Sequence, residues 1–219
     1  MITLVVFDWN GVLIADAKAC LDAENYILEQ YGRKPVSMKR YRETVSIPAK
    51  EFFLKNGFTP DEMRRYSRKM QEMFHAQYEP LVRRVRTRRN ARRLLEWLSK
   101  RGITMIILSN HTREGIRPHL QRLSIGKYFT EVLANDRQSA MHKKNKRERL
   151  KSFLAKNRYR KDRILIIGDS PEEIEVGKLF GIKTVSITGG YYATRRLREL
   201  KPDHLISNLA DMVRIVKEV

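Results

Sequence analysis

The sequence predicts an α/β fold in which helices cover both faces of a parallel β-sheet, with a small helical domain inserted into it. Three observations support this prediction. Short apolar runs rich in Ile, Val and Leu recur along the chain, and several end in a polar turn, as buried parallel strands do. Stretches with helical periodicity separate these runs. Between the first two runs, at residues 15–82, the patterns are helical only.

The composition is that of a globular chain with a basic surface. Of 219 residues, 42% are hydrophobic and 32% are charged, and the charged share exceeds the roughly 25% of ordinary domains. The net charge of +20 predicts attraction to polyanions such as nucleic acids or phosphorylated metabolites. Cys20 is the single cysteine, which excludes an intrachain disulfide or a cysteine metal cluster and favours a cytoplasmic location. The first apolar run is interrupted by Asp8 and Asn10, so we expect neither a signal peptide nor a membrane span.

Residues 4–7, with the sequence LVVF, form the first predicted strand, and the polar turn after it begins at Asp8. In open parallel sheets, ligands bind just beyond the carboxyl ends of the strands. A carboxylate at that place can bind a divalent cation or attack phosphorus as a nucleophile. Gly11 lets backbone N–H groups approach an anion closely.

Three helical stretches are predicted after this turn. The first begins at Ala17, and the second covers about 37–54 with a break at Pro48. The third begins after Thr59, because the threonine side chain can cap a helix and a proline follows in the first helical position. These stretches predict a small inserted helical domain at residues 15–82.

Residues 83–93 carry seven arginines where the chain returns from the insert. This run is either a solvated connector or a basic rim over a phosphate site. We therefore expect the α/β domain to consist of residues 1–14 and 83–219.

The remaining strands are predicted at residues 103–108, 131–134, 164–167, 184–187 and 204–206. The strand at 103–108 leads into a predicted turn at 109–112, where the Ser109 hydroxyl and the next helix form an anion site. The strand at 164–167 leads to Asp169. Because the carboxyl ends of parallel strands meet at one edge, Asp8, Ser109 and Asp169 are expected to lie together, and the two carboxylates suit Mg²⁺.

These segments resemble the haloacid dehalogenase superfamily of phosphatases, in particular its phosphoglycolate-phosphatase-like branch, across essentially the whole chain. The sequence VVFDWNGVL matches the first motif, IILSN the second and IIGDSPEE the fourth. The resemblance implies a Rossmann-like core and makes the helical insert the cap domain of that family.

The resemblance also implies roles for individual residues. Asp8 would be the nucleophile and a metal ligand. Ser109 would bind the transferring phosphoryl group, with the Asn110 backbone beside it. Asp169 would bind Mg²⁺, and Glu173 lies where the family has its second acid and would hold a metal-bound water.

The third-motif lysine of the family is matched by Lys146, which is followed by Leu150 in the spacing K-x-x-x-L. Lys143 and Lys144 are rival candidates. A lysine at this place would offset the negative charge of the carboxylates.

Asn10 departs from the family, in which an aspartate at this position protonates the leaving oxygen and then activates water. Its backbone carbonyl can still bind Mg²⁺, but its amide cannot carry the proton. General acid–base catalysis contributes about 10²–10⁴-fold to the rate. Activation of water is therefore left to Asn10, His111 or solvent.

The sequence thus predicts a Mg²⁺-dependent phosphatase that hydrolyses a small phosphorylated metabolite through an aspartyl phosphate. Two alternatives stay open. The basic surface could recruit a nucleic-acid end or a phosphoprotein as substrate, which we favour less because no motif of a known binding module is present. The chain could also be a weakly active or non-catalytic phosphate-binding member. The sequence predicts neither the substrate nor the oligomeric state.

Overall fold

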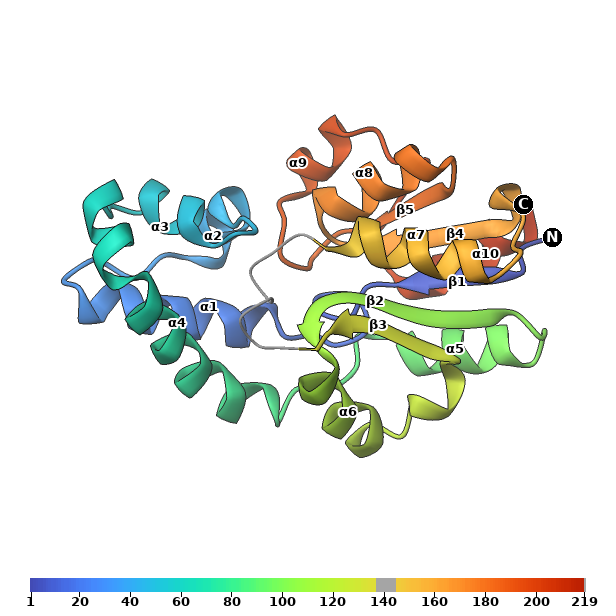
Figure 1. The fold of residues 1–219 in the computed structure, drawn as a ribbon, viewed down its shortest axis with the longest axis horizontal. Coiled ribbons are helices and arrows are strands. Elements are labelled where there is room, and N and C mark those ends of the chain that lie inside the picture. The colour runs from blue at the N-terminus through green and yellow to red at the C-terminus, as the bar shows by residue number, and fades with distance from the viewer. Residues whose placement is uncertain (137–144, 219) are drawn as a thin grey trace.

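A computed structural model describes residues 1–136 and 145–218 (Figure 1). Its centre is a six-stranded sheet in the order β3-β2-β1-β4-β5-β6, in which every neighbouring pair is parallel. The strands are β1 (Leu4–Phe7), β2 (Thr104–Thr112), β3 (Glu131–Asn135), β4 (Ile164–Gly168), β5 (Lys183–Ile187) and β6 (His204–Ile206). The predicted α/β fold with a parallel sheet is confirmed.

Strand β1 lies between β2 and β4, and this register positions the site. Phe7 pairs with Ile107 on one side and with Ile167 on the other. The residues that follow these positions therefore reach the same edge of the sheet, where Asp8 occupies the centre.

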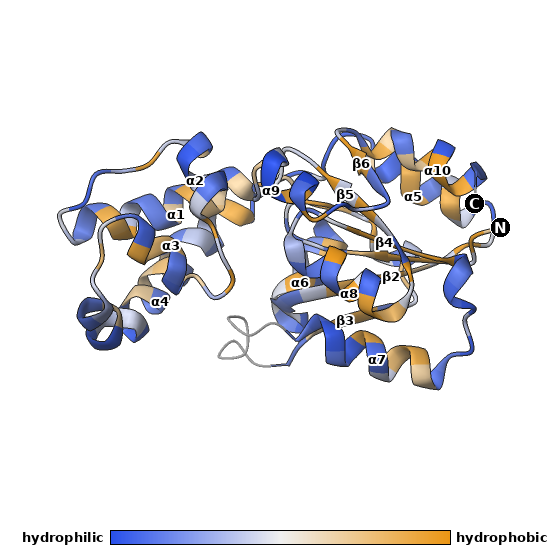
Figure 2. Cartoon of the chain, turned by 90° about the horizontal axis from the view of Figure 1, so that it is seen from above, coloured by the Kyte–Doolittle hydropathy of each residue, from blue (hydrophilic) through white to orange (hydrophobic). Residues whose placement is uncertain are grey.

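Apolar side chains of the central strand alternate between two layers of helices, because successive residues of a strand point to opposite faces. Val5 and Phe7 belong to the apolar cluster that includes residues of α5 (Ala91–Ser99), α6 (Arg113–Arg122) and α10 (Met212–Glu218). Leu4 and Val6 belong to the cluster beneath α7 (Lys146–Lys156) and α8 (Pro171–Phe180). Figure 2 shows apolar strands between helices with hydrophilic outer faces.

The segment between β1 and β2 is helical, as predicted. Its helices are α1 (Ala17–Gln30), α2 (Met38–Thr44), α3 (Lys50–Lys55) and α4 (Pro60–Val82). They lie at one end of the molecule, and both termini lie at the other (Figures 1 and 2). Thr59 caps α4 as expected: its hydroxyl accepts from the Glu62 N–H at 3.2 Å, and the Glu62 carboxylate accepts from the Thr59 N–H at 2.8 Å.

The chain leaves and re-enters the sheet domain at neighbouring points. The Ala15 N–H donates to the Arg86 carbonyl at 3.1 Å, and the Arg88 N–H donates to the Leu13 carbonyl at 2.9 Å. The helices α1–α4 are thus joined to the sheet by two paired segments.

The turn predicted at residues 109–112 is wrong, because β2 continues through Thr112. The extension is held by β3, where Thr112 pairs with Asn135 and the Asn135 amide donates to the Asn110 carbonyl. A polar sequence can continue a strand when a neighbouring strand satisfies its backbone. Within residues 1–136 and 145–218, no helix has the length and apolar character needed to cross a membrane.

Candidate active site

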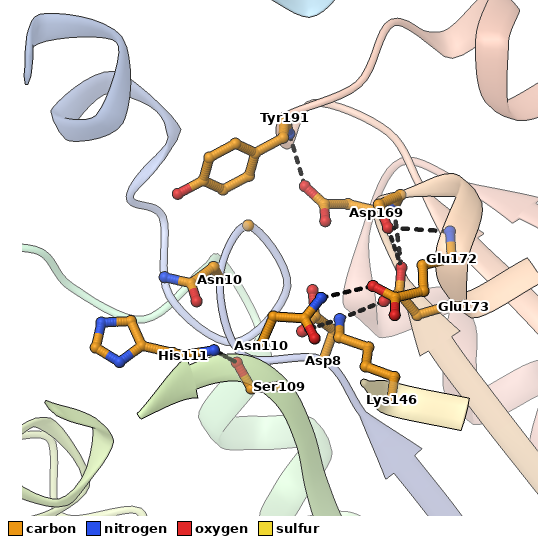
Figure 3. A network of polar contacts seen from close by, with 12 residues as sticks. Asp8, Asn10, Ser109, Asn110, His111, Lys146, Asp169, Glu172, Glu173 and Tyr191 are labelled. Atoms are coloured by element: carbon orange, nitrogen blue, oxygen red, sulfur yellow. Dashed lines mark hydrogen bonds and ion pairs between the residues drawn. The ribbon is translucent and has the colours of Figure 1, made fainter. Parts of the chain in front are cut away.

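A buried ion-pair cluster lies beyond the end of β1. Lys146 Nζ, at the start of α7, lies 2.7 Å from Asp8 Oδ1 and also contacts Glu173 Oε1 (Figure 3). Burial disfavours the Lys146 ammonium, but the Asp8 and Glu173 carboxylates outweigh this effect and raise its pKa. Lys146 is therefore a cation fixed beside Asp8. The rival candidates Lys143 and Lys144 lie outside the described residues.

Three carboxylates converge at this cluster. Asp8, Asp169 and Glu173 each offer an oxygen, and these oxygens lie within 4.8 Å of one another. Burial raises the pKa of Asp8 to about 7, despite the attraction of Lys146. Burial and repulsion from Asp8 raise the pKa of Asp169. Because the Lys146 ammonium balances only one of three negative charges, and the donors are oxygens, the site fits a hard divalent cation.

Glu173 is fixed by the N-terminus of α8. Its Oε2 accepts from the Ser170 hydroxyl at 2.7 Å and from the Ser170 N–H at 3.1 Å, while its Oε1 contacts Lys146. The Asp169 Oδ2 in turn accepts from the Tyr191 N–H at 2.6 Å. Asp169 and Glu173 are thus both held in place by the protein.

The end of β2 contributes Ser109 and Asn110. Ser109 is buried, and its hydroxyl accepts from the His111 N–H at 3.0 Å. The Asn110 side chain donates to Glu172 Oε2 at 2.6 Å and accepts from the Asn145 N–H at 3.3 Å. Its amide therefore links β2 to α7 and α8, which leaves the Asn110 backbone for the role implied by the resemblance. Glu172 was not expected from the sequence.

The Asn10 side chain points away from the ion-pair cluster and into a second buried network. Its Nδ2 donates to Asp16 Oδ2 at 2.6 Å and to the Tyr78 hydroxyl at 3.1 Å. Asp16 also accepts from the hydroxyls of Tyr78 and Tyr191, each at 2.7 Å, and from the Gly11 N–H at 2.8 Å. Asp16, Tyr78 and Tyr191 were missed because these contacts join residues 62 and 175 positions apart. The only local signal was an acid just before a helix.

His111 lies beside Asn10 in Figure 3, and both residues line a cavity that begins at Asp8. Burial lowers its pKa, so the neutral ring dominates at pH 7. Its Nδ1 lies 2.8 Å from the Thr112 nitrogen and 3.3 Å from the Thr112 carbonyl oxygen, so whether Nδ1 accepts or donates depends on the tautomer. The part of His111 in activating water stays a prediction.

The arginine run contributes one contact at the site. Arg88 donates to the Gly11 carbonyl at 2.6 Å and to the Thr188 carbonyl at 2.7 Å. The other arginines of the run are exposed: Arg83, Arg84, Arg86, Arg89, Arg92 and Arg93. Arg88 therefore braces two loops of the site through their backbones.

A cavity of about 540 Å³ extends from Asp8 to the helices α1–α4. Glu24 lines it from α1, is 4% exposed, and its Oε2 has no hydrogen-bond partner in the part of the chain that the structure describes. Burial raises the pKa of Glu24 to about 8. No sequence pattern marked Glu24, because a single acid within a helical stretch does not show which side of the helix is buried.

This buried acid makes the stability depend on pH. Because the pKa of folded Glu24 exceeds its ordinary value of 4.5, its contribution is complete below about pH 4.5 and is lost as the pH rises to about 8. We expect Glu24→Gln to gain on the order of 3 kcal/mol of unfolding free energy relative to wild type between pH 4.5 and pH 8.5. Urea unfolding at both pH values measures this difference. The exposed residue of the same helix, Glu29→Gln, is the control and should show no such gain; an equal result for both variants would contradict the prediction.

Comparison with known proteins agrees with this geometry. The family model of the haloacid dehalogenase-like hydrolases matches residues 5–187. Phosphoglycolate phosphatase of Pseudomonas fluorescens is 27% identical over 217 residues, which cover 96% of this chain and 78% of that protein. Phosphoglycolate phosphatase of Synechococcus elongatus is 21% identical over 98% of this chain and 97% of its own.

The fold is also shared with solved structures. A haloacid dehalogenase-like hydrolase from Streptococcus pneumoniae superposes with a TM-score of 0.78 at 17% identity, and the match covers 98% of both chains. The family model spans most of the sheet and all of the helices α1–α4. The chain therefore belongs to the haloacid dehalogenase-like hydrolase family, as its three motifs predicted.

Proposed function

We propose that this protein is a Mg²⁺-dependent phosphatase that hydrolyses a phosphomonoester of a small molecule through an aspartyl phosphate on Asp8. The observation that carries the proposal is the buried contact of Asp8 with Lys146 beside Asp169, at the end of a cavity. The relatives named phosphoglycolate phosphatase support the reaction class. In this proposal, residues 15–82 are the cap domain that encloses the substrate.

In the first step, an Asp8 carboxylate oxygen attacks phosphorus, and the bond between phosphorus and the alcohol oxygen breaks. The alkoxide that leaves takes its proton from solvent, because the Asn10 amide cannot supply one. Lys146 offsets the negative charge that otherwise repels a phosphate dianion from Asp8. The Ser109 hydroxyl would bond a phosphoryl oxygen.

Asp8, Asp169 and the Asn10 carbonyl are the groups that would hold Mg²⁺, with Glu173 acting through a water. When bound, the ion neutralises charge on the transferring phosphoryl group. The chain's own share of this work is orientation: Tyr191 holds Asp169, and Ser170 holds Glu173.

In the second step, water attacks phosphorus, the bond to Asp8 breaks, and the Asp8 carboxylate and inorganic phosphate are released. The Asn10 amide cannot take the proton of that water, so His111 or solvent would accept it. Positioning and electrostatics still supply most of the acceleration in phosphoryl transfer. We therefore expect slow but genuine turnover.

Removal of the metal tests the proposal. Hydrolysis of an aryl phosphate in Mg²⁺ should fall to background when EDTA is added in excess and should return when Mg²⁺ is restored, because the carboxylate charge is then uncompensated. The matched control is EDTA presaturated with Mg²⁺, which should leave the rate unchanged. Turnover that persists in EDTA would overturn the metal-dependent reaction.

A further inference from the structure

The cavity beyond the ion-pair cluster is much larger than a phosphoryl group requires. Its volume of about 540 Å³ lies within the range of pockets that enclose whole organic ligands, about 300–1,000 Å³. Apart from the acidic end, its walls are mainly apolar side chains of the helices α1–α4 and the loops between them, among them Ile27, Val45, Phe53, Met63, Met70 and Phe74. Such walls favour an apolar organic group.

Glu24 is the exception in this apolar wall. It lies on α1 about one turn after Cys20, on the same face as Cys20 and Ile27, which also line the cavity. Eight residues separate Glu24 from Asp16, so at 1.5 Å per residue the two lie roughly 12 Å apart along the helix. Asp16 marks the catalytic end through Asn10. Glu24 therefore lies in the cavity wall away from the catalytic end, with Ile27 about one turn further along α1.

The Glu24 carboxyl has no structural role that explains its burial. Its Oε2 is buried without a hydrogen-bond partner within residues 1–136 and 145–218. A buried polar group without a partner is destabilising and is rarely retained unless a ligand or water satisfies it. Glu24 lines the cavity wall, so a change of its side-chain rotamer would bring this oxygen to a ligand in the cavity.

The charge of the wall limits the ligand further. Above about pH 8 Glu24 is ionised, and a carboxylate held beside it would be repelled strongly across the apolar space. Lys50 also lines the cavity, but it is exposed to solvent, so its attraction for a carboxylate is screened. A substrate as small as the phosphoglycolate named for the relatives would not fill a cavity of about 540 Å³.

We propose that the substrate is a phosphomonoester whose organic group is largely apolar, spans roughly 10 Å, and ends in a hydrogen-bond donor, a hydroxyl or an amine, that bonds Glu24. This inference rests on the proposed function and names the substrate class of the same site. Glu24 acts as a specificity-determining residue, remote from the reacting atoms.

A set of matched phosphates tests it. Octyl phosphate, 8-hydroxyoctyl phosphate, 8-aminooctyl phosphate, 8-phosphonooxyoctanoate and phosphoglycolate are compared by kcat/KM, with an aryl phosphate as the reference for basal activity. The hydroxyl and amine compounds should exceed octyl phosphate by about 10-fold or more, because a site built to bond a donor rejects an analogue without it. At pH 9, where Glu24 is ionised, the two carboxylates should be the poorest substrates. The hydroxyl and amine arms show which donor is preferred.

Variants of Glu24 separate recognition from catalysis. Glu24→Leu should abolish the advantage of the hydroxyl and amine compounds and raise activity on octyl phosphate. Glu24→Gln should retain the hydroxyl advantage and lose most of the amine advantage, since the charge is gone. Glu24→Gln also tests the inference if Glu24→Leu does not fold. The exposed Glu29→Gln should leave all ratios unchanged.

The outcomes distinguish this inference from the proposed function. Equal kcat/KM for the matched octyl series, a preference for phosphoglycolate, or ratios that Glu24 variants leave unchanged would each overturn the inference while the phosphatase stands. If wild type hydrolyses none of the compounds, including the aryl phosphate, the proposed function fails. The inference is then decided by calorimetric binding of the same octyl compounds. Loss of the preference for the amine in Glu24→Gln, or for both donors in Glu24→Leu, supports the inference. Unchanged preferences in these variants overturn it.

Discussion

Asp8→Asn should lower kcat for an aryl phosphate by about 10⁴-fold or more, because an amide oxygen is too weak a nucleophile to attack phosphorus. The fold should be retained, since the asparagine oxygen can still accept from Lys146 Nζ, which lies 2.7 Å from Asp8 Oδ1. Rates are compared after equal thermal stability has been established by unfolding. The exposed Asp162→Asn is the matched control and should keep full activity.

A trapping experiment sharpens this prediction. Acid quench of the wild type during turnover, followed by borohydride reduction and mass spectrometry, should place the modification on Asp8. Asp8→Asn should give none. Retention of more than a tenth of the wild-type rate in Asp8→Asn, or a modification at another residue, would contradict the aspartyl phosphate on Asp8.

Exchange of Asn10 and Asp16 should increase activity. In Asn10→Asp alone, two carboxylates would meet where the amide now donates at 2.6 Å. Such a pair shares one proton between its two carboxylates, so the introduced acid does not release that proton to the substrate. In Asn10→Asp with Asp16→Asn, the amide donates in the opposite direction and the hydrogen bond is kept. The double variant therefore carries a carboxyl group at position 10 with no second carboxylate beside it.

We expect the double variant to exceed wild type by about 10²-fold in kcat, the lower end of what general acid–base catalysis contributes. The gain should be larger for an alkyl phosphate than for p-nitrophenyl phosphate, because nitrophenolate leaves without a proton. The control is Asp16→Asn alone, which gains no acid and brings two amides into contact at positions 10 and 16, so it should not exceed wild type on either substrate. If the double variant equals wild type on both substrates, the amide at position 10 does not limit turnover.

Local patterns were sufficient to predict most of the fold. The apolar run at 4–7 and its abrupt end at Asp8 predicted a central strand, because a strand buried on both faces is continuously apolar. Thr59 and the proline after it predicted the start of α4 by capping alone. The turn at 109–112 was wrong because continuation of β2 depends on a neighbouring strand, which no local pattern contains.

The sequence by itself determined which strands end in candidate functional residues, since residue type and the end of an apolar run are properties of short segments. Only the tertiary structure decided which side chains meet. It placed Lys146 against Asp8, 138 positions away, and joined Asn10 to Asp16 and Tyr78. It also turned Glu24 into the cavity. Such contacts depend on how helices pack across the sheet edge, and burial there fixes both the partners and the charge of each group.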